Sequence, residues 1–131
     1  METSKIQLVK QLNKQARIVR SYLATYEKCR DGEGDKTHLL NKADDLLGVL
    51  REFCELMFKF GESVNSKEIC GLHFRWQSVE IVYSLYQLAA RYDLPNKRAQ
   101  LYRLADDVVK QYSDLVVDLV RAFGKCIGSE A

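Results

Sequence analysis

Four long segments of this chain repeat apolar side chains at alternating intervals of three and four residues, and the whole sequence contains a single proline. This interval pattern places the apolar side chains on one face of an α-helix. Helices of such length, joined by short loops, pack as an antiparallel up-down-up-down four-helix bundle. The sequence therefore predicts an all-α fold and one domain over residues 1–131, with a frayed tail at about 125–131. The expected helices cover residues 3–28, 37–60, 66–92 and 96–125.

Turn and capping residues mark the three breaks between these helices. The first break is the glycine-rich run 31–35, after which Thr37 is a candidate N-cap. We expect Gly61 to follow the end of the second helix, and Ser66 to cap the third. Proline suits the first turn of a helix and not its interior, so Pro95 marks the start of the fourth.

Composition excludes several classes of protein. With 47% hydrophobic residues and a net charge of +2, the chain is neither disordered nor uniformly basic. No secretory signal and no membrane-spanning apolar run is evident, so we expect a cytoplasmic protein with reduced thiols at its four cysteines. The alternative is a secreted four-helix cytokine with two disulfides.

The chain lacks a recognisable catalytic or metal-binding pattern. Neither His38 nor His73 completes the Glu-x-x-His spacing of di-iron bundles. Cys70 and His73 lie one helical turn apart and offer two zinc ligands, a distant alternative because zinc needs more. The adjacent pairs Asp44–Asp45 and Asp106–Asp107 are interpreted as solvated surface charge. We therefore expect no enzyme activity, no metal and no cofactor.

The small net charge of the whole chain, +2, conceals a basic first helix. Residues 1–30 hold seven basic and two acidic side chains, whereas residues 31–60 hold four basic and seven acidic ones. On a helical wheel, four of the basic residues fall within about 60° of one another, opposite the apolar stripe. These four, Lys10, Lys14, Arg17 and Lys28, are here called the basic ridge, with Arg20 at its flank. Such a ridge suits phosphate groups or an acidic protein surface, and Lys97 and Arg98 would extend it at one end.

Several aromatic residues lie off the apolar stripes. Trp76, Tyr83 and Tyr86 belong to the stripe of the third helix and are expected in the core. Phe74 and Tyr92 lie off its centre, and Tyr22 and Phe58 flank the stripes of their own helices. Apolar residues on a second face indicate a further surface to bury, which favours a homo-oligomer.

The order of these features resembles the ribosomal-RNA intervening-sequence proteins and the related accessory variability determinant (Avd) proteins over residues 17–125. The resemblance rests on the basic first helix at 17–23, the Asp-Leu-Leu core from 45 to Leu56, a polar loop with Lys67, the run 84–89 and the junction from Leu94 to Tyr102. The family often has arginines where this chain has Tyr83 and Gln87. The resemblance implies a pentamer of four-helix bundles that binds RNA or DNA through basic residues and assists a reverse transcriptase.

Two functions are therefore expected. The first is a non-enzymatic, oligomeric protein that binds RNA or DNA phosphates through the basic face of its first helix, as an accessory to a partner such as a reverse transcriptase. The second is a protein-interaction module, meaning an adaptor, viral or effector protein or a small subunit of a larger complex, that does not bind nucleic acid. In that case exposed apolar residues such as Phe74 and Tyr92 would make the contacts.

Overall fold

A computed structural model describes residues 2–34, 36–92 and 95–130, with the backbone alone for residues 2–4, 95, 129 and 130. The described part of the chain is all-helical and contains no strand. Asp35, Asp93, Leu94 and Ala131, to which the expected loops and tail extend, lie outside the described residues. The elements are α1 (Glu2–Asp31), α2 (Leu39–Ser63), α3 (Lys67–Gly71), α4 (His73–Arg91), the short 3-10 helix η1 (Pro95–Lys97) and α5 (Arg98–Glu130).

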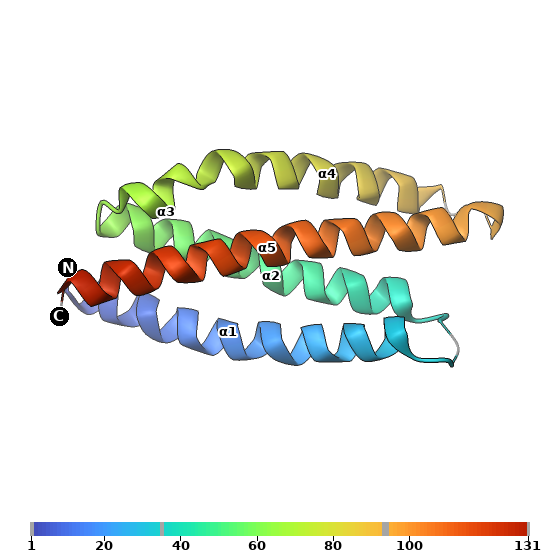
Figure 1. Ribbon diagram of the computed structural model, residues 1–131, viewed down its shortest axis with the longest axis horizontal. Helices are drawn as coiled ribbons and strands as arrows, with labels where there is room; N and C mark the ends of the chain where they lie inside the picture. The colour runs from blue at the N-terminus through green and yellow to red at the C-terminus, as the bar shows by residue number, and fades with distance from the viewer. Residues whose placement is uncertain (1, 35, 93–94, 131) are drawn as a thin grey trace.

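The four long helices lie side by side (Figure 1). α2 and α5 occupy the middle, and α5 packs on both α2 and α4. α1 packs mainly on α2 and lies along the side of the molecule opposite α4. The start of α1 and the end of α5 lie at the same end of the molecule as the turn from α2 to α3.

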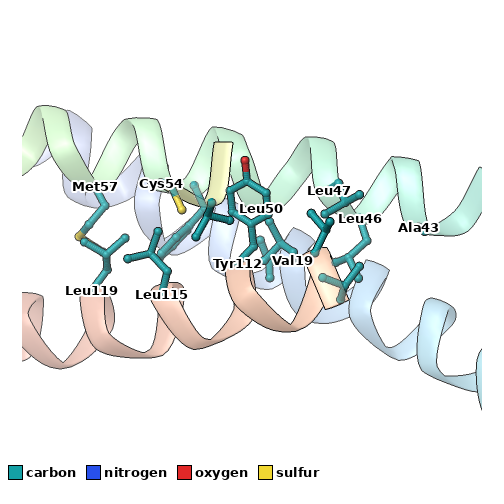
Figure 2. Close-up of a cluster of buried hydrophobic side chains, with 14 of the residues drawn as sticks. Val19, Ala43, Leu46, Leu47, Leu50, Cys54, Met57, Tyr112, Leu115 and Leu119 are labelled. Atoms are coloured by element: carbon teal, nitrogen blue, oxygen red, sulfur yellow. The ribbon is translucent and has the colours of Figure 1, made fainter. Parts of the chain in front are cut away.

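The predicted apolar stripes form the core. Every stripe residue of the four predicted helices is buried or half-buried, with Val108, Leu115 and Leu119 of α5 fully enclosed. Figure 2 shows side chains of α2 facing those of α5, with Met57 opposite Leu119 and Cys54 beside Leu115. Phe58, expected only to flank its stripe, is buried against the rings of His73 and Trp76.

The turn after α2 differs from the expectation in the role of Gly61. This glycine lies inside α2 and is buried, and the left-handed residue that ends the helix is Asn65, with φ of 55°. The amide of Ser66 donates to the carbonyl of Gly61 at 2.9 Å, and that of Asn65 to Glu62 at 3.3 Å. This is a Schellman arrangement, in which asparagine tolerates the left-handed conformation that glycine often supplies. Ser66 then caps α3 as predicted, because its side chain accepts a hydrogen bond from the amide of Ile69.

Gly61 is required for close packing, and this gives a paired prediction. A Cβ atom at position 61 would lie 2.8 Å from the Cβ of Ile69, whereas one at Gly48 in the same helix would meet nothing within 4 Å. Gly61→Ala is expected to lower the free energy of unfolding by about 2 kcal/mol through overpacking. Gly48→Ala should raise it by ~0.5–1 kcal/mol, because alanine favours a helix interior over glycine. Urea unfolding of both variants tests the pair, and destabilisation of equal size would show that Ile69 is not the cause.

The other helix ends shift by a few residues. His38 and not Thr37 is the N-cap residue of α2, and it makes no side-chain capping bond. The predicted third helix is divided at Leu72, directly after Gly71, into α3 and α4. The last helix begins at Arg98 after a 3-10 turn and continues to Glu130, beyond the predicted end at Lys125. No helix among the described residues is both long enough and apolar enough to cross a membrane.

Candidate nucleic-acid interface

The basic ridge lies on the outer face of α1. Leu12, Val19 and Tyr26 of the same helix are buried, with at most 8% of their surface exposed. Lys10 and Lys14 lie on the opposite side of the helix and are exposed. The period of 3.6 residues explains this separation, since residues seven or eleven apart return to the same face. The remaining ridge residues, Arg17 and Lys28, and the flanking Arg20 are exposed as well.

Two polar side chains, Gln15 and Tyr26, fix the rotation of α1 against its neighbours. The side-chain amide of Gln15 donates to the carbonyl of Val49 at 3.1 Å and to Glu52 at 3.2 Å, both in α2. The hydroxyl of Tyr26 donates to Asp106 of α5 at 2.8 Å. Because both anchors point inward, the ridge on the far side of the helix points to solvent.

The ridge carries positive charge without compensating partners. Across residues 2–34, 36–92 and 95–130, no ion pair joins the ridge residues or Arg20 to a carboxylate. The α1 carboxylate at Glu27 lies 3.9 Å from Arg30 instead. Arg30 is also bound to Asp31 and Asp106, which raise the pKa of its guanidinium and hold it away from the ridge. The ridge can therefore meet an anion without first breaking an internal pair.

Arg20 stands at the edge of a shallow apolar groove between α1 and α5. The groove has a volume of about 210 Å³ and lies over Phe53 of α2. Its walls are Val19 and Leu23 on α1 and Val116, Val117 and Val120 on α5. Arg20, at the flank of the ridge, therefore adjoins an apolar surface. The four ridge residues do not line this groove.

Lys97 and Arg98 lie apart from α1. Lys97 ends η1 and Arg98 begins α5, at the end of the molecule where the loop from α1 to α2 also lies (Figure 1). Both side chains are exposed. They place basic charge at this end of the molecule, on a different element from the ridge.

Cys70 and His73 line a small open depression together with Phe58 and Glu62. Among the described residues, no three His, Cys, Asp or Glu side chains are grouped closely enough to hold a metal ion. His73 instead packs its ring against Phe58 and Trp76, at centroid distances of 5.2 and 5.3 Å. The four cysteines form no disulfide in the described part of the chain.

The aspartate pairs lie at the surface, with Asp44, Asp45 and Asp107 exposed and the Asp106 side chain 41% exposed, but one member of each pair also accepts a tyrosine hydroxyl. Asp44 accepts a hydrogen bond from the hydroxyl of Tyr86 at 2.8 Å, and Asp106 accepts one from Tyr26. A third tyrosine, Tyr112, donates in the same way to Glu80. Burial is the main cause that raises the pKa of all three hydroxyls, and the carboxylate acceptors raise it further.

Sequence reasoning did not find these three tyrosine–carboxylate pairs, because the partners are between 32 and 80 residues apart in the chain. The only signal was the position of each tyrosine in an apolar stripe, since a buried hydroxyl needs a hydrogen-bond partner.

No protein-family model, curated protein or solved structure matches this chain.

Proposed function

We propose that this protein is an antiparallel up-down-up-down four-helix bundle that binds the phosphate backbone of RNA or DNA through the outer face of α1 and catalyses no reaction. The exposed basic ridge carries the proposal, because no carboxylate among the described residues neutralises it. From Lys10 to Lys28 the ridge extends about 27 Å along the helix axis, at about 1.5 Å per residue. That length corresponds to roughly eight nucleotides at a rise of about 3.4 Å.

Contacts of this type position a protein on nucleic acid without reading its sequence. A non-enzymatic accessory role follows, as the resemblance to the intervening-sequence and Avd proteins also implies. In that role the protein is a homo-oligomer, a pentamer in the resembling family, and it assists a partner such as a reverse transcriptase. An oligomer would repeat the modest ridge of one chain and so strengthen binding by multivalency.

Salt dependence tests the proposal directly. If the ridge and Arg20 all contact phosphates, log K should fall with log salt with a slope of about 4 to 5 for duplex DNA. Replacing Lys14→Glu with Arg17→Glu removes two contacts and adds repulsion. The slope should fall by about 2, and the affinity at low salt should fall by at least ~10-fold. Fluorescence anisotropy with a labelled duplex and a labelled single-stranded RNA measures both quantities.

A matched control separates the ridge from the total charge. Lys59 of α2 and Lys110 of α5 are exposed and lie on other helices. Lys59→Glu with Lys110→Glu changes the net charge by the same amount and should leave most of the affinity. Equal losses in the two double variants, or no binding of the wild type at low salt, would refute the proposal.

The alternative function is a protein-interaction module that does not bind nucleic acid. The observation that favours it is the exposure of large apolar residues on α4 and at its C-cap, including Phe74 at 79% and Tyr92 at 70%. Unchanged mobility of RNA and DNA in the presence of a well-folded protein would support this alternative over the first proposal.

A further inference from the structure

The outer face of α4 carries a second apolar seam in addition to the seam that faces the core. Val79 and Tyr86 belong to the inner seam and are buried. The outer seam consists of Phe74, Ile81, Leu85, Leu88 and Tyr92. Each of these residues exposes between 51% and 79% of its surface. With Ser78, these residues follow intervals of four and three, the spacing of side chains at a helix–helix seam. α4 therefore presents a surface suited to a second helix.

This face of α4 is free of charge. α4 contains three charged side chains, and two of them turn toward other helices: Arg75 pairs with Asp118 of α5, and Glu80 with Arg51 of α2. The hydroxyls of Ser78 and Ser84 donate to backbone carbonyls one turn earlier, at 3.4 and 3.0 Å. The outer seam consequently offers apolar area and small residues without a charge, and the one phenol in it belongs to Tyr92 at its C-terminal end.

The apolar area is close to what a stable interface needs. For side chains of this size, the exposed fractions of the five seam residues leave on the order of 600 Å² of surface. A standard interface buries about 800 Å² on each partner. The seam with its neighbouring small residues therefore approaches one complete side of an interface.

We propose that a second copy of this chain covers the outer seam, so that two α4 helices pack against each other about a two-fold axis. A face without charge can meet an identical face without like-charge repulsion, whereas a partner of opposite charge would find nothing to pair with on it. Small residues at Ser78, Ser84 and Ala89 allow the two helices to approach closely.

Charge at the helix ends sets the relative direction of the two copies. The C-terminal end of α4 is basic, with Arg91 and Lys97 exposed there. A parallel pair would bring two such ends together, whereas an antiparallel pair separates them and opposes the two helix dipoles. The antiparallel pair centred on the seam places Leu85 of one copy beside Ile81 of the other.

This interface rests on the homo-oligomer of the proposed function, which it makes a two-fold dimer in place of the pentamer that the resemblance implies, and it is independent of nucleic-acid binding. α1 lies on the side of the molecule opposite α4 (Figure 1), so a pair formed through α4 leaves both basic ridges exposed. Oligomeric mass and nucleic-acid binding can therefore be measured on the same samples as two separate results.

Light scattering and sedimentation of the purified chain at micromolar concentrations test the interface. The wild type is expected to associate, and Leu85→Glu to weaken the association by at least ~100-fold, because each copy would bury an unpaired charge. Ile81→Lys should have the same effect. The control is Val117→Glu on α5, which introduces the same charge at a valine that is 48% exposed and lines the groove near α1; it should keep the wild-type mass. Circular dichroism must show equal helix content in all variants.

Mixing the two α4 variants tests the antiparallel direction. Leu85→Glu and Ile81→Lys should each be monomeric alone and should form a mixed dimer when combined, because the new charges then lie side by side. A mixture that stays monomeric would overturn the antiparallel arrangement, and unchanged association of Leu85→Glu would overturn the α4 interface. A monomeric wild type would remove both the interface and the oligomer, while salt-dependent RNA or DNA binding by that monomer would leave the ridge proposal standing.

Discussion

Above pH 10 this protein is expected to lose its fold steeply, because three buried tyrosines keep their protons only while the chain is folded. The hydroxyls of Tyr26 and Tyr86 donate to Asp106 and Asp44 at 2.8 Å, and Tyr112 donates to Glu80. In each case burial is the largest cause that raises the pKa, and the carboxylate acceptor adds to it, because an ionised tyrosine there would be desolvated beside another negative charge. All three pKa values lie well above the ordinary value of 10.0.

The direction of this pH dependence follows from the number of protons that the folded and the unfolded chain bind. Above pH 10 the unfolded chain releases protons from these tyrosines and the folded chain retains them, so the free energy of unfolding falls as the pH rises. Each tyrosine contributes up to ~1.4 kcal/mol per pH unit, and the three together about 4 kcal/mol per unit. Burial also raises the pKa of the Cys54 thiol from 9.0 to about 12, so a weaker loss begins near pH 9. The stability that these groups contribute is fully present below that range.

Two signals recorded together measure this effect. Far-ultraviolet circular dichroism follows the helices, and absorbance follows tyrosinate formation. Tyrosinate absorbance equivalent to three side chains is expected to appear only as the helix signal is lost. Tyr86→Phe should reduce the pH slope by about a third, since it removes one of the three protons. Complete tyrosine ionisation with the helices intact would contradict the prediction.

The helices and their core could be predicted from the sequence because their signals are local. The three-and-four spacing identified every buried stripe, and the basic face of α1 follows from the period of one helix. The end of α2 was misplaced because Gly61 serves a contact with Ile69, across a turn that spacing does not describe. In the same way, local spacing identifies Asp44 and Asp106 as surface charges but does not identify Tyr86 and Tyr26, distant in sequence, as their hydrogen-bond donors.

α4 shows a second limit on what spacing alone can predict. Its sequence contains two apolar seams, one through Val79 and Tyr86 and one through Ile81 and Leu85. Both seams have the spacing of an α-helix, so periodicity alone does not tell which of them is buried. The packing of α4 on α5 decides which seam faces the core. Spacing alone therefore does not identify the residues of the outer seam between Phe74 and Tyr92 as an interaction surface. The position of Lys97 and Arg98 relative to the ridge likewise depends on how helices distant in sequence pack.

The largest loss of stability from a single charged residue is expected at Glu80, the centre of contacts among α2, α4 and α5. Its carboxylate accepts hydrogen bonds from Arg51 at 2.8 and 2.9 Å and from the hydroxyl of Tyr112. Burial alone would raise the pKa of Glu80, but these hydrogen bonds outweigh it and lower the pKa. Glu80→Ala would leave a half-buried guanidinium and a buried hydroxyl without an acceptor. The free energy of unfolding in urea is therefore expected to fall by about 3 kcal/mol.

The ion pair between Arg75 and Asp118 provides the control, because it joins α4 to α5 but its side chains are 41% and 38% exposed. Water screens such a pair, so Asp118→Ala should lower the free energy of unfolding by less than ~1 kcal/mol. Replacing both partners of the half-buried pair, with Arg51→Met and Glu80→Leu, should recover much of the stability lost in Glu80→Ala, since no unpaired charge remains. If Glu80→Ala and Asp118→Ala are equally mild, the Glu80 carboxylate is solvated and does not organise the three helices. If the double replacement is no more stable than Glu80→Ala, the loss of stability comes from packing around Tyr112. It does not then come from the unpaired charge of Arg51.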